Sequence, residues 1–373
     1  MLGKFLSLIR DAKIASVFGL QGATDVYFYA ITLIVLVSAF IPRSINTTVI
    51  PALMRASLGG DEKAKLMLLS NIVSCTMIAG FLMAVAFGLI AFWPSAVELL
   101  TPGFDDSQRH DLSLMILMGI PSIFFLSIVA VNRGYLQSEG RFLESEISEL
   151  CLALVGIVAM LYFADSLGFY VLIIAIVVAS ILQIGIQTFG LSRLPFRYTP
   201  YINLQDRQMK VIGVLIVPVL ISTGISDISK IVDQALGSTL DGGGLSALAF
   251  GGKINGLVVG ICIVSLVTVI FPIISKSAAS GDIVKLKDEL RQVINTVLMI
   301  TLPATVIVLT LSDNIVSVLF ERGQFGTDAT KITSEVLFFY SLGLAFAGLR
   351  LVLIKVFYSL QDTITVVKCA IVA

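Results

Sequence analysis

The sequence predicts an all-α polytopic membrane protein with two pseudo-symmetric helical lobes, and two observations lead to this expectation. The mean hydropathy is +0.99, and only 13% of the 373 residues are charged, against about 25% in soluble domains. The chain also contains an internal repeat that is long enough to span several helices. Repeats of this kind are typical of membrane transporters.

The repeat consists of two apolar stretches that end in a proline and lie 221 residues apart. A cation and a Gly-Asp pair follow each proline at matching offsets, and one phenylalanine further along the chain corresponds as well. The matching positions are Pro51 and Pro272, Arg55 and Lys276, Gly60-Asp61 and Gly281-Asp282, and Phe104 and Phe325. We therefore expect an N-lobe of six transmembrane helices over residues 1–193. A C-lobe of about four and a half helices should follow over residues 207–373, so this second lobe would be incomplete.

The predicted transmembrane helices are apolar stretches, most of them close to or above the roughly 20 residues that a hydrocarbon core requires. They cover residues 5–19, 25–54, 66–98, 111–136, 147–164, 168–191, 211–237, 245–275, 293–320 and 332–358, and another begins at 365. The first of these is interrupted by Arg10-Asp11 and Lys13 and has no small-residue cleavage site after it. We therefore expect a membrane helix there and not a cleaved signal peptide.

The loop charges predict the orientation. Alternate connections, starting after the second predicted helix, carry 13 cations, whereas the opposite connections carry three. The 13 are Arg55, Lys63, Lys65, Arg133, Arg141, Arg193, Arg197, Arg207, Lys210, Lys276, Lys285, Lys287 and Arg291, and the three are Arg109, Arg322 and Lys331. The positive-inside rule places the first set, and with it the N-terminus, in the cytoplasm.

Several function classes find no support in the sequence. Lys and Arg balance Asp and Glu at 25 each, so no strongly basic field indicates a nucleic-acid partner. The four cysteines lie in apolar stretches, at spacings that suit neither a disulfide framework nor a metal site. There is no phosphate-binding loop and only one histidine, His110. We expect a protein that is not an enzyme and has no cofactor, and in which any transport draws on a Na⁺ or H⁺ gradient, the membrane potential or the substrate gradient.

Charged residues inside the apolar stretches are the candidate functional residues. An Arg or Lys at the bilayer centre costs about 2.5–3.5 kcal/mol, so such a residue usually faces a cavity or a partner. The cations are Arg10, Lys13, Arg43, Lys230 and Lys253, and the acids are Asp11, Asp25, Asp227 and Asp233. The cations slightly outnumber the acids, which favours a cavity for an anion such as a pyrophosphate.

Structural explanations stand beside these functional ones. Arg10, Asp11 and Lys13 could belong to an interfacial N-terminal segment. Asp227, Lys230 and Asp233 are spaced i, i+3 and i+6, so they share one helix face and could form an ion site or simply neutralise one another.

Short motifs throughout the chain resemble those of the MurJ (MviN) family. These motifs are Ile9-Arg-Asp-Ala12, Ala23-Thr-Asp25, Thr101-Pro-Gly-Phe104, Gly140-Arg-Phe142, Ile231-Val-Asp233, Leu319-Phe-Glu-Arg-Gly-Gln-Phe325 and Phe357-Tyr-Ser-Leu-Gln-Asp-Thr363. Members are lipid II flippases of the multidrug/oligosaccharidyl-lipid/polysaccharide exporter superfamily. The resemblance implies two six-helix lobes around a central cationic cavity, and two further helices that form a lipid-tail groove.

The resemblance also implies site residues. Arg10 corresponds to a cavity arginine of the family and Asp25 to its Thr-Asp aspartate. A second family arginine falls on Ser38, and Arg43 carries a cation about one turn further on. The second half departs from the family pattern as well, because a family arginine falls on Lys253 and a glutamate falls on Gly256. Asp233 falls where some relatives bind sodium.

The resemblance implies a flippase that moves a polyprenyl-pyrophosphate-linked sugar, lipid II above all, to the outer leaflet by alternating access, as part of peptidoglycan synthesis. Arg10, Arg43 and Lys253 would hold the pyrophosphate, and Asp25 would support the arrangement or gate it. We expect a monomer in the bacterial inner membrane, surrounded by membrane lipids. Three alternatives remain: a flippase for another lipid-linked polysaccharide unit, a drug/cation antiporter of the same superfamily, and a non-transporting membrane scaffold.

Overall fold

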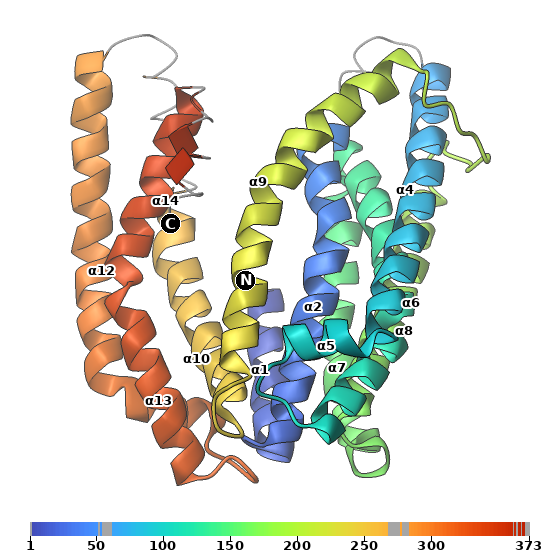
Figure 1. The fold of residues 1–373 in the computed structure, drawn as a ribbon. Helices are drawn as coiled ribbons and strands as arrows, with labels where there is room; N and C mark the ends of the chain where they lie inside the picture. The colour runs from blue at the N-terminus through green and yellow to red at the C-terminus, as the bar shows by residue number, and fades with distance from the viewer. Residues whose placement is uncertain are drawn as a thin grey trace. The chain divides into compact units, whose positions relative to one another are not determined.

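The computed structural model describes residues 2–50, 53, 62–267, 277, 283–360, 362, 365–366 and 368–369, and the regular structure of these residues is entirely helical (Figure 1). This confirms the predicted all-α fold class. The chain forms two compact units. The first consists of Met1–Lys13 and Gln21–Gly242, and the second of Ile14–Leu20 and Gly243–Ala373.

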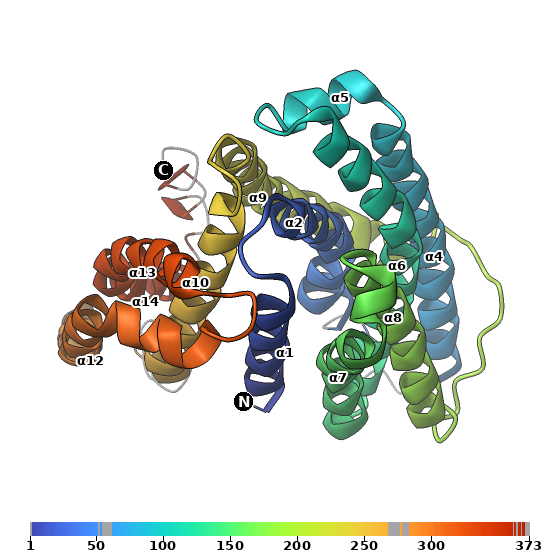
Figure 2. The ribbon, with the colours of Figure 1, turned by 90° about the horizontal axis from the view of Figure 1, so that it is seen from below.

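The first unit is a helical bundle in which α4, α6, α8 and α7 pack against one another in that order, and α2 packs on α6 (Figure 2). Its elements are α1 (Leu2–Phe18), α2 (Gly22–Ser44), the π-helix η1 (Ile45–Val49), α4 (Glu62–Ala91), α5 (Pro94–Leu100), α6 (Asp106–Ser138), α7 (Phe142–Leu167), α8 (Tyr170–Leu191) and α9 (Arg207–Gly237). The end of α1, from Ile14, belongs to the second unit.

The second unit packs α12 against both α13 and α14, and α10 against α13. Its elements are α10 (Gly244–Val259), the π-helix η2 (Gly260–Val264), α12 (Ile283–Phe320), α13 (Thr327–Leu342) and α14 (Leu344–Ser359). Its core includes Ile263, Val297 and Val352, which are almost fully buried.

The described residues are helical within all ten complete helices predicted from the sequence, although the ends of the predicted helices 25–54 and 245–275 lie partly outside these residues. Three of the ten are interrupted. In the predicted helix 293–320, Leu311 of α12 has non-helical φ −113° and ψ 15°. The predicted helix 66–98 ends at Ala91, because Pro94 disfavours helical backbone at Trp93, which adopts φ −103° and ψ 97°. The predicted helix 332–358 is bent by 44° between Leu342 and Leu344. The helix expected to begin at 365 falls mostly outside the described residues.

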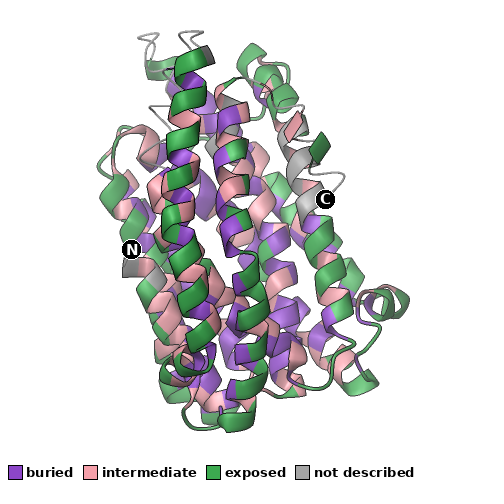
Figure 3. Cartoon of the chain, turned by 90° about the vertical axis from the view of Figure 1, so that its left-hand side faces the viewer, coloured by how far each residue is buried: buried purple, intermediate pink, exposed green. Residues whose placement is uncertain are grey.

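Seven helices among the described residues are long and apolar enough to cross a membrane, and the bent pair α13 and α14 would make an eighth. Their outer surfaces carry large apolar side chains, such as Phe81, Leu89 and Met299. Figure 3 shows exposed residues along the whole length of the helices that face the viewer. Exposed apolar surface on this scale requires hydrocarbon around it, so the protein is a multi-span membrane protein.

The internal repeat reappears as two matching aromatic pairs. In the first unit the Tyr29 and Phe104 rings pack edge to face, with centroids 5.5 Å apart. In the second unit Phe250 and Phe325 pack in the same way at 5.7 Å. Both residues of the second pair lie 221 positions after those of the first. The sequence repeat therefore corresponds to a packing contact that occurs once in each unit. The prolines and the Gly-Asp pairs of the repeat lie outside the described residues.

The helix α9, which the sequence assigns to the C-lobe, makes its contacts with α2, η1 and α4. It therefore belongs to the first compact unit, and that unit ends at Gly242 and not at residue 193. The predicted lobes and the compact units are divisions of different kinds, so the lobe boundaries at residues 193 and 207 stay a prediction.

Two glycines of the family-like motifs allow close backbone contacts. Gly103, in the first unit, lies against the end of α9, where an added Cβ would be 2.1 Å from the Ser238 carbonyl oxygen. Gly323, in the second unit, has φ +59°, and an added Cβ would be 2.2 Å from the Ser16 carbonyl oxygen. The same carbonyl accepts a hydrogen bond of 2.9 Å from the Gln324 backbone N–H.

We predict that Gly323→Ala destabilises the second unit. The left-handed conformation alone costs a non-glycine residue about 1–2 kcal/mol, and the contact with Ser16 adds steric repulsion. Thermal unfolding in detergent should therefore give a lower melting temperature than for the wild type.

Gly326→Ala is the matched control, because Gly326 lies in the same turn with φ −85° and an added Cβ there would meet no atom within 4 Å. Equal melting temperatures for the two variants would contradict the close packing of Gly323.

Candidate functional site

An ion-pair network joins α2 to α9 inside the first unit. The Arg43 Nη1 atom donates to Asp227 Oδ2, and the Lys230 Nζ atom donates to Asp227 Oδ1 at 3.1 Å. The Asp227 side chain is only 5% exposed, whereas Arg43 is 30% and Lys230 is 52% exposed. One buried carboxylate is thus shared by two cations that approach from more open surroundings.

This network explains how Asp227 can be ionised inside an apolar helix bundle. A buried charge is tolerated when partners satisfy it with hydrogen bonds, and here each carboxylate oxygen accepts one bond from a cation. The i, i+3 spacing had left a pairing of Asp227 with Lys230 within α9 as one of two possibilities. It did not predict Arg43, which comes from a helix 184 residues away.

Asp233 lies apart from this network. It is an exposed residue, and among the described residues no ion pair joins it to Lys230 or another cation. The i, i+3, i+6 spacing therefore brings together Asp227 and Lys230 but leaves the third residue outside the pair.

Arg10 is held by its neighbour on α1. Its Nε and Nη2 atoms donate to Asp11 Oδ1 at 3.1 and 2.9 Å. The Asp11 side chain is 5% exposed and Arg10 is 19% exposed. The aliphatic part of Arg10 passes α7 at Gly156, where an added Cβ would lie 2.9 Å from Arg10 Cδ. The glycine thus leaves space on α7 for the arginine.

Asp25 is buried in the first turn of α2. Its backbone N–H donates to the Gln21 carbonyl oxygen at 3.1 Å. The unpaired N–H groups and the dipole at a helix N-terminus stabilise a carboxylate at this position. Asp25 and Arg43 therefore lie near opposite ends of the same helix.

Lys253 lies in α10, in the second unit. Its side chain is half-buried, and its Nζ atom lies 5.9 Å from the centroid of the Phe250 ring. Gly256, one turn further along, is exposed, and an added Cβ there would meet no atom within 4 Å. This part of α10 is therefore open beside the cation.

Ser38 stands where the family resemblance implies an arginine. Its side chain is buried, and its Oγ atom has no hydrogen-bond partner among the described residues. An arginine there would need both space and a counter-charge inside the bundle. Arg43 is more exposed and has Asp227, so the cation sits where a partner exists.

The sequence reasoning missed a further buried pair. Lys65 was assigned to a loop, but it lies in α4 with 11% of its side chain exposed and donates to Glu139 at the end of α6. Its Nζ atom also lies 5.8 Å from the centroid of the Tyr135 ring. The pair joins the ends of two helices. No local sequence pattern predicts it, because Lys65 and Glu139 are 74 residues apart.

The sequence matches the family described as lipid II flippase MurJ over residues 14–373. The chain belongs to this family. Among similar curated proteins, the probable lipid II flippase MurJ of Rhizobium tropici is 27% identical over 380 residues, which cover 96% of this chain and 69% of the relative. The protein of the same name from Rickettsia prowazekii (strain Madrid E) is 26% identical over 376 residues, which cover 98% and 72%.

Solved structures of two kinds share the fold. A lipid II flippase MurJ in an inward closed conformation superposes with a TM-score of 0.81 at 23% identity, covering 99% of this chain and 77% of that one. An inward-facing multidrug resistance MATE family transporter of the MOP superfamily gives 0.76 at 14% identity, covering 99% and 83%. The architecture is therefore that of the MurJ and MATE-like superfamily.

We predict energetic coupling between Arg43 and Asp227. In a double-mutant cycle with Arg43→Gln and Asp227→Asn, the coupling free energy should be about 0.5–3 kcal/mol, as for residues in one ion-pair network. The measurement is the unfolding of the four proteins in detergent.

The control cycle pairs Arg43→Gln with Asp233→Asn, which lies on the same helix but outside the network. These two changes should be additive within about 0.5 kcal/mol. Additivity in the Asp227 cycle would show that the contact contributes nothing to stability.

Proposed function

We propose that this protein translocates lipid II, a lipid carrying a sugar on a pyrophosphate, across the bacterial plasma membrane. The observation that carries the proposal is the family match over residues 14–373. The relatives from Rhizobium tropici and Rickettsia prowazekii bear the name probable lipid II flippase MurJ. The cations within the membrane helices supply the chemistry that an anionic headgroup requires.

Arg10 and Arg43 in the first unit, and Lys253 in the second unit, are each proposed to bind the pyrophosphate during transport. A guanidinium has five N–H donors in a planar fork that suits phosphate oxygens, whereas a lysine ammonium acts as a point charge. The bonds from Arg10 to Asp11 use one N–H each of Nε and Nη2. Among the bonds of the described residues, three N–H donors of Arg10 are then left for an oxyanion.

When no substrate is bound, the carboxylates of Asp11 and Asp227 would accept the hydrogen bonds that the pyrophosphate would otherwise accept. Asp11 and Asp227 accept bonds from Arg10 and Arg43 in this structure, which offsets the cost of holding those cations in an apolar environment. An arriving pyrophosphate competes with these carboxylates for the same donors. Asp25, buried at the start of α2, would support the arrangement or gate it.

Transport would proceed by alternating access, in which the two lobes open in turn to the two sides of the membrane. The sugar would cross within the protein while the lipid tail stays in the bilayer. The energy would come from a Na⁺ or H⁺ gradient, the membrane potential or the substrate gradient. We place the N-terminus in the cytoplasm and propose that the protein works as a monomer.

A second candidate substrate is another polyprenyl-pyrophosphate-linked glycan. Ser38 and Gly256 favour it, because they replace a cation and an acid that the family resemblance implies at these positions. Such substrates share the pyrophosphate, so the same three cations would bind them.

We predict that Arg10→Ala and Lys253→Ala each impair transport. The test expresses the full reading frame in a bacterium depleted of its own lipid II flippase, and it measures growth and the arrival of lipid II in the outer leaflet. Loss of a charge-assisted hydrogen bond, about 1.5–3 kcal/mol, should reduce transport at least about tenfold. Lys253→Arg should retain activity because it keeps the charge.

Arg133→Ala is the matched control, because Arg133 pairs with Glu146 and Glu149 in exposed surroundings. It should support normal growth. If the wild type restores growth and the Arg10→Ala and Lys253→Ala variants restore it equally well, the proposed role of these cations is rejected. Failure of a well-expressed wild type would reject lipid II and direct the test to other lipid-linked glycans, to cationic drugs or to a scaffold role.

A further inference from the structure

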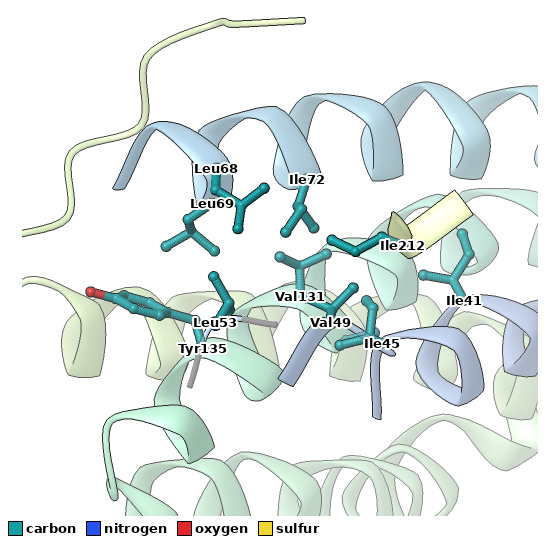
Figure 4. Close-up of a cluster of buried hydrophobic side chains, with 11 residues drawn as sticks. Ile41, Ile45, Val49, Leu53, Leu68, Leu69, Ile72, Val131, Tyr135 and Ile212 are labelled. Carbon is teal, nitrogen blue, oxygen red and sulfur yellow. The ribbon is translucent and has the colours of Figure 1, made fainter. Parts of the chain in front are cut away.

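The first unit contains a cavity of about 330 Å³ that the proposed transport site does not use. It lies between α2, η1, α4 and α9, and the residues around it include Phe40, Ile45, Ile72, Cys75, Ile212 and Ile216. Figure 4 shows part of this region, where Ile45, Ile72 and Ile212 lie with the neighbouring apolar core. All of these elements belong to one compact unit.

The lining is almost entirely apolar. Two of its few polar groups already donate to neighbours on their own helix: Ser44 Oγ to the Phe40 carbonyl oxygen at 2.9 Å, and Cys75 Sγ to Asn71 Oδ1 at 3.6 Å. A bound water needs about two to four polar partners, and cavities without them stay dry. The cavity is thus unsuited to water, an ion or a sugar, and suited to hydrocarbon.

The cavity lies at hydrocarbon depth. Its α4 residues run from Ile72 to Met83, in the middle of a helix that extends from Glu62 to Ala91. At about 1.5 Å per residue, both ends of this stretch are more than 10 Å from the helix termini. The large apolar residues Ile78 on α4 and Leu215 on α9 lie next to the lining, and each is 46% exposed.

We propose that this cavity binds one acyl chain of a bilayer phospholipid. A cavity of about 150 Å³ accommodates benzene, which has six carbons, so the volume here corresponds to about a dozen carbons. That capacity matches most of one unbranched acyl chain. A polyprenyl chain has a methyl branch on every isoprene unit and is far longer, so it fits this space less well.

The location links the lipid to the ion-pair network. Phe40 and Ser44 line the cavity and flank Arg43 on α2, while Ile216 and Leu220 line it on α9, the helix of Asp227. An acyl chain would therefore fill the space between the same two helices that the Arg43–Asp227 pair joins. The chain would supply the dispersion contacts that the lining of an empty apolar cavity lacks.

Photocrosslinking tests this proposal independently of transport. The protein is reconstituted in vesicles of phosphatidylethanolamine and phosphatidylglycerol that contain a phospholipid with a diazirine in the middle of one acyl chain. After irradiation, mass spectrometry maps the labelled residues. We expect labelling of the cavity residues of α2, α4 and α9, and a reduction of about tenfold, or ~1.4 kcal/mol, in Ala79→Trp.

Ala79 lines the cavity from α4, where it is exposed at the edge, so tryptophan there fills the space from outside. Ala86→Trp is the matched control, because Ala86 is an exposed alanine of the same helix outside the lining. It should leave the labelling unchanged. Equal labelling of the two variants, or labels spread evenly over the exposed residues, would overturn the proposal.

Cys75 provides a second readout that needs no cavity-filling variant. In a protein that retains Cys75 as its one cysteine, added phospholipid should slow alkylation of delipidated protein by a small maleimide about tenfold. An unchanged rate would overturn the proposal. Protection by a polyprenyl phosphate but not by phospholipid would assign the cavity to the substrate tail and would equally reject our assignment.

Discussion

The structure depends on the need to neutralise charge inside a membrane. An isolated ion in an apolar interior carries a desolvation cost that only a well-placed partner offsets. Arg10 has Asp11, Arg43 and Lys230 share Asp227, and Lys65 has Glu139. Two of these pairs also join helices: Arg43–Asp227 joins α2 to α9, and Lys65–Glu139 joins α4 to the end of α6. The same ion pairs thus neutralise charges and hold helices together in this protein.

The pairs also give the proposed site a defined state in the absence of substrate. The two arginines that would bind a pyrophosphate are already oriented, because their carboxylate partners hold them. Substrate binding then becomes an exchange of one anion for another and not the creation of a new charge. Such an exchange limits affinity, but it also allows release, which a transporter requires as much as capture.

Much of the fold could be predicted from the sequence, because hydropathy and helix length are local properties. The positions of the ten helices followed from this, and the register of the repeat extended to Tyr29 and Phe250, which complete the aromatic pairs of Phe104 and Phe325. The site was less predictable. The partnership of Arg43 with Asp227, the burial of Ser38 and the exposure of Asp233 depend on which helix faces meet, and helices distant in sequence decide that.

One consequence concerns the order in which the protein is made. The segment Ile14–Leu20 belongs to the same compact unit as Gly243–Ala373, and Ser16 accepts a bond from Gln324, 308 residues later. At about 5–20 residues per second, a ribosome needs roughly 15–60 s to cover that distance. The end of the first helix must therefore wait in the membrane until the chain up to Gln324 has been inserted. The second unit then closes around a segment that was made about 300 residues earlier.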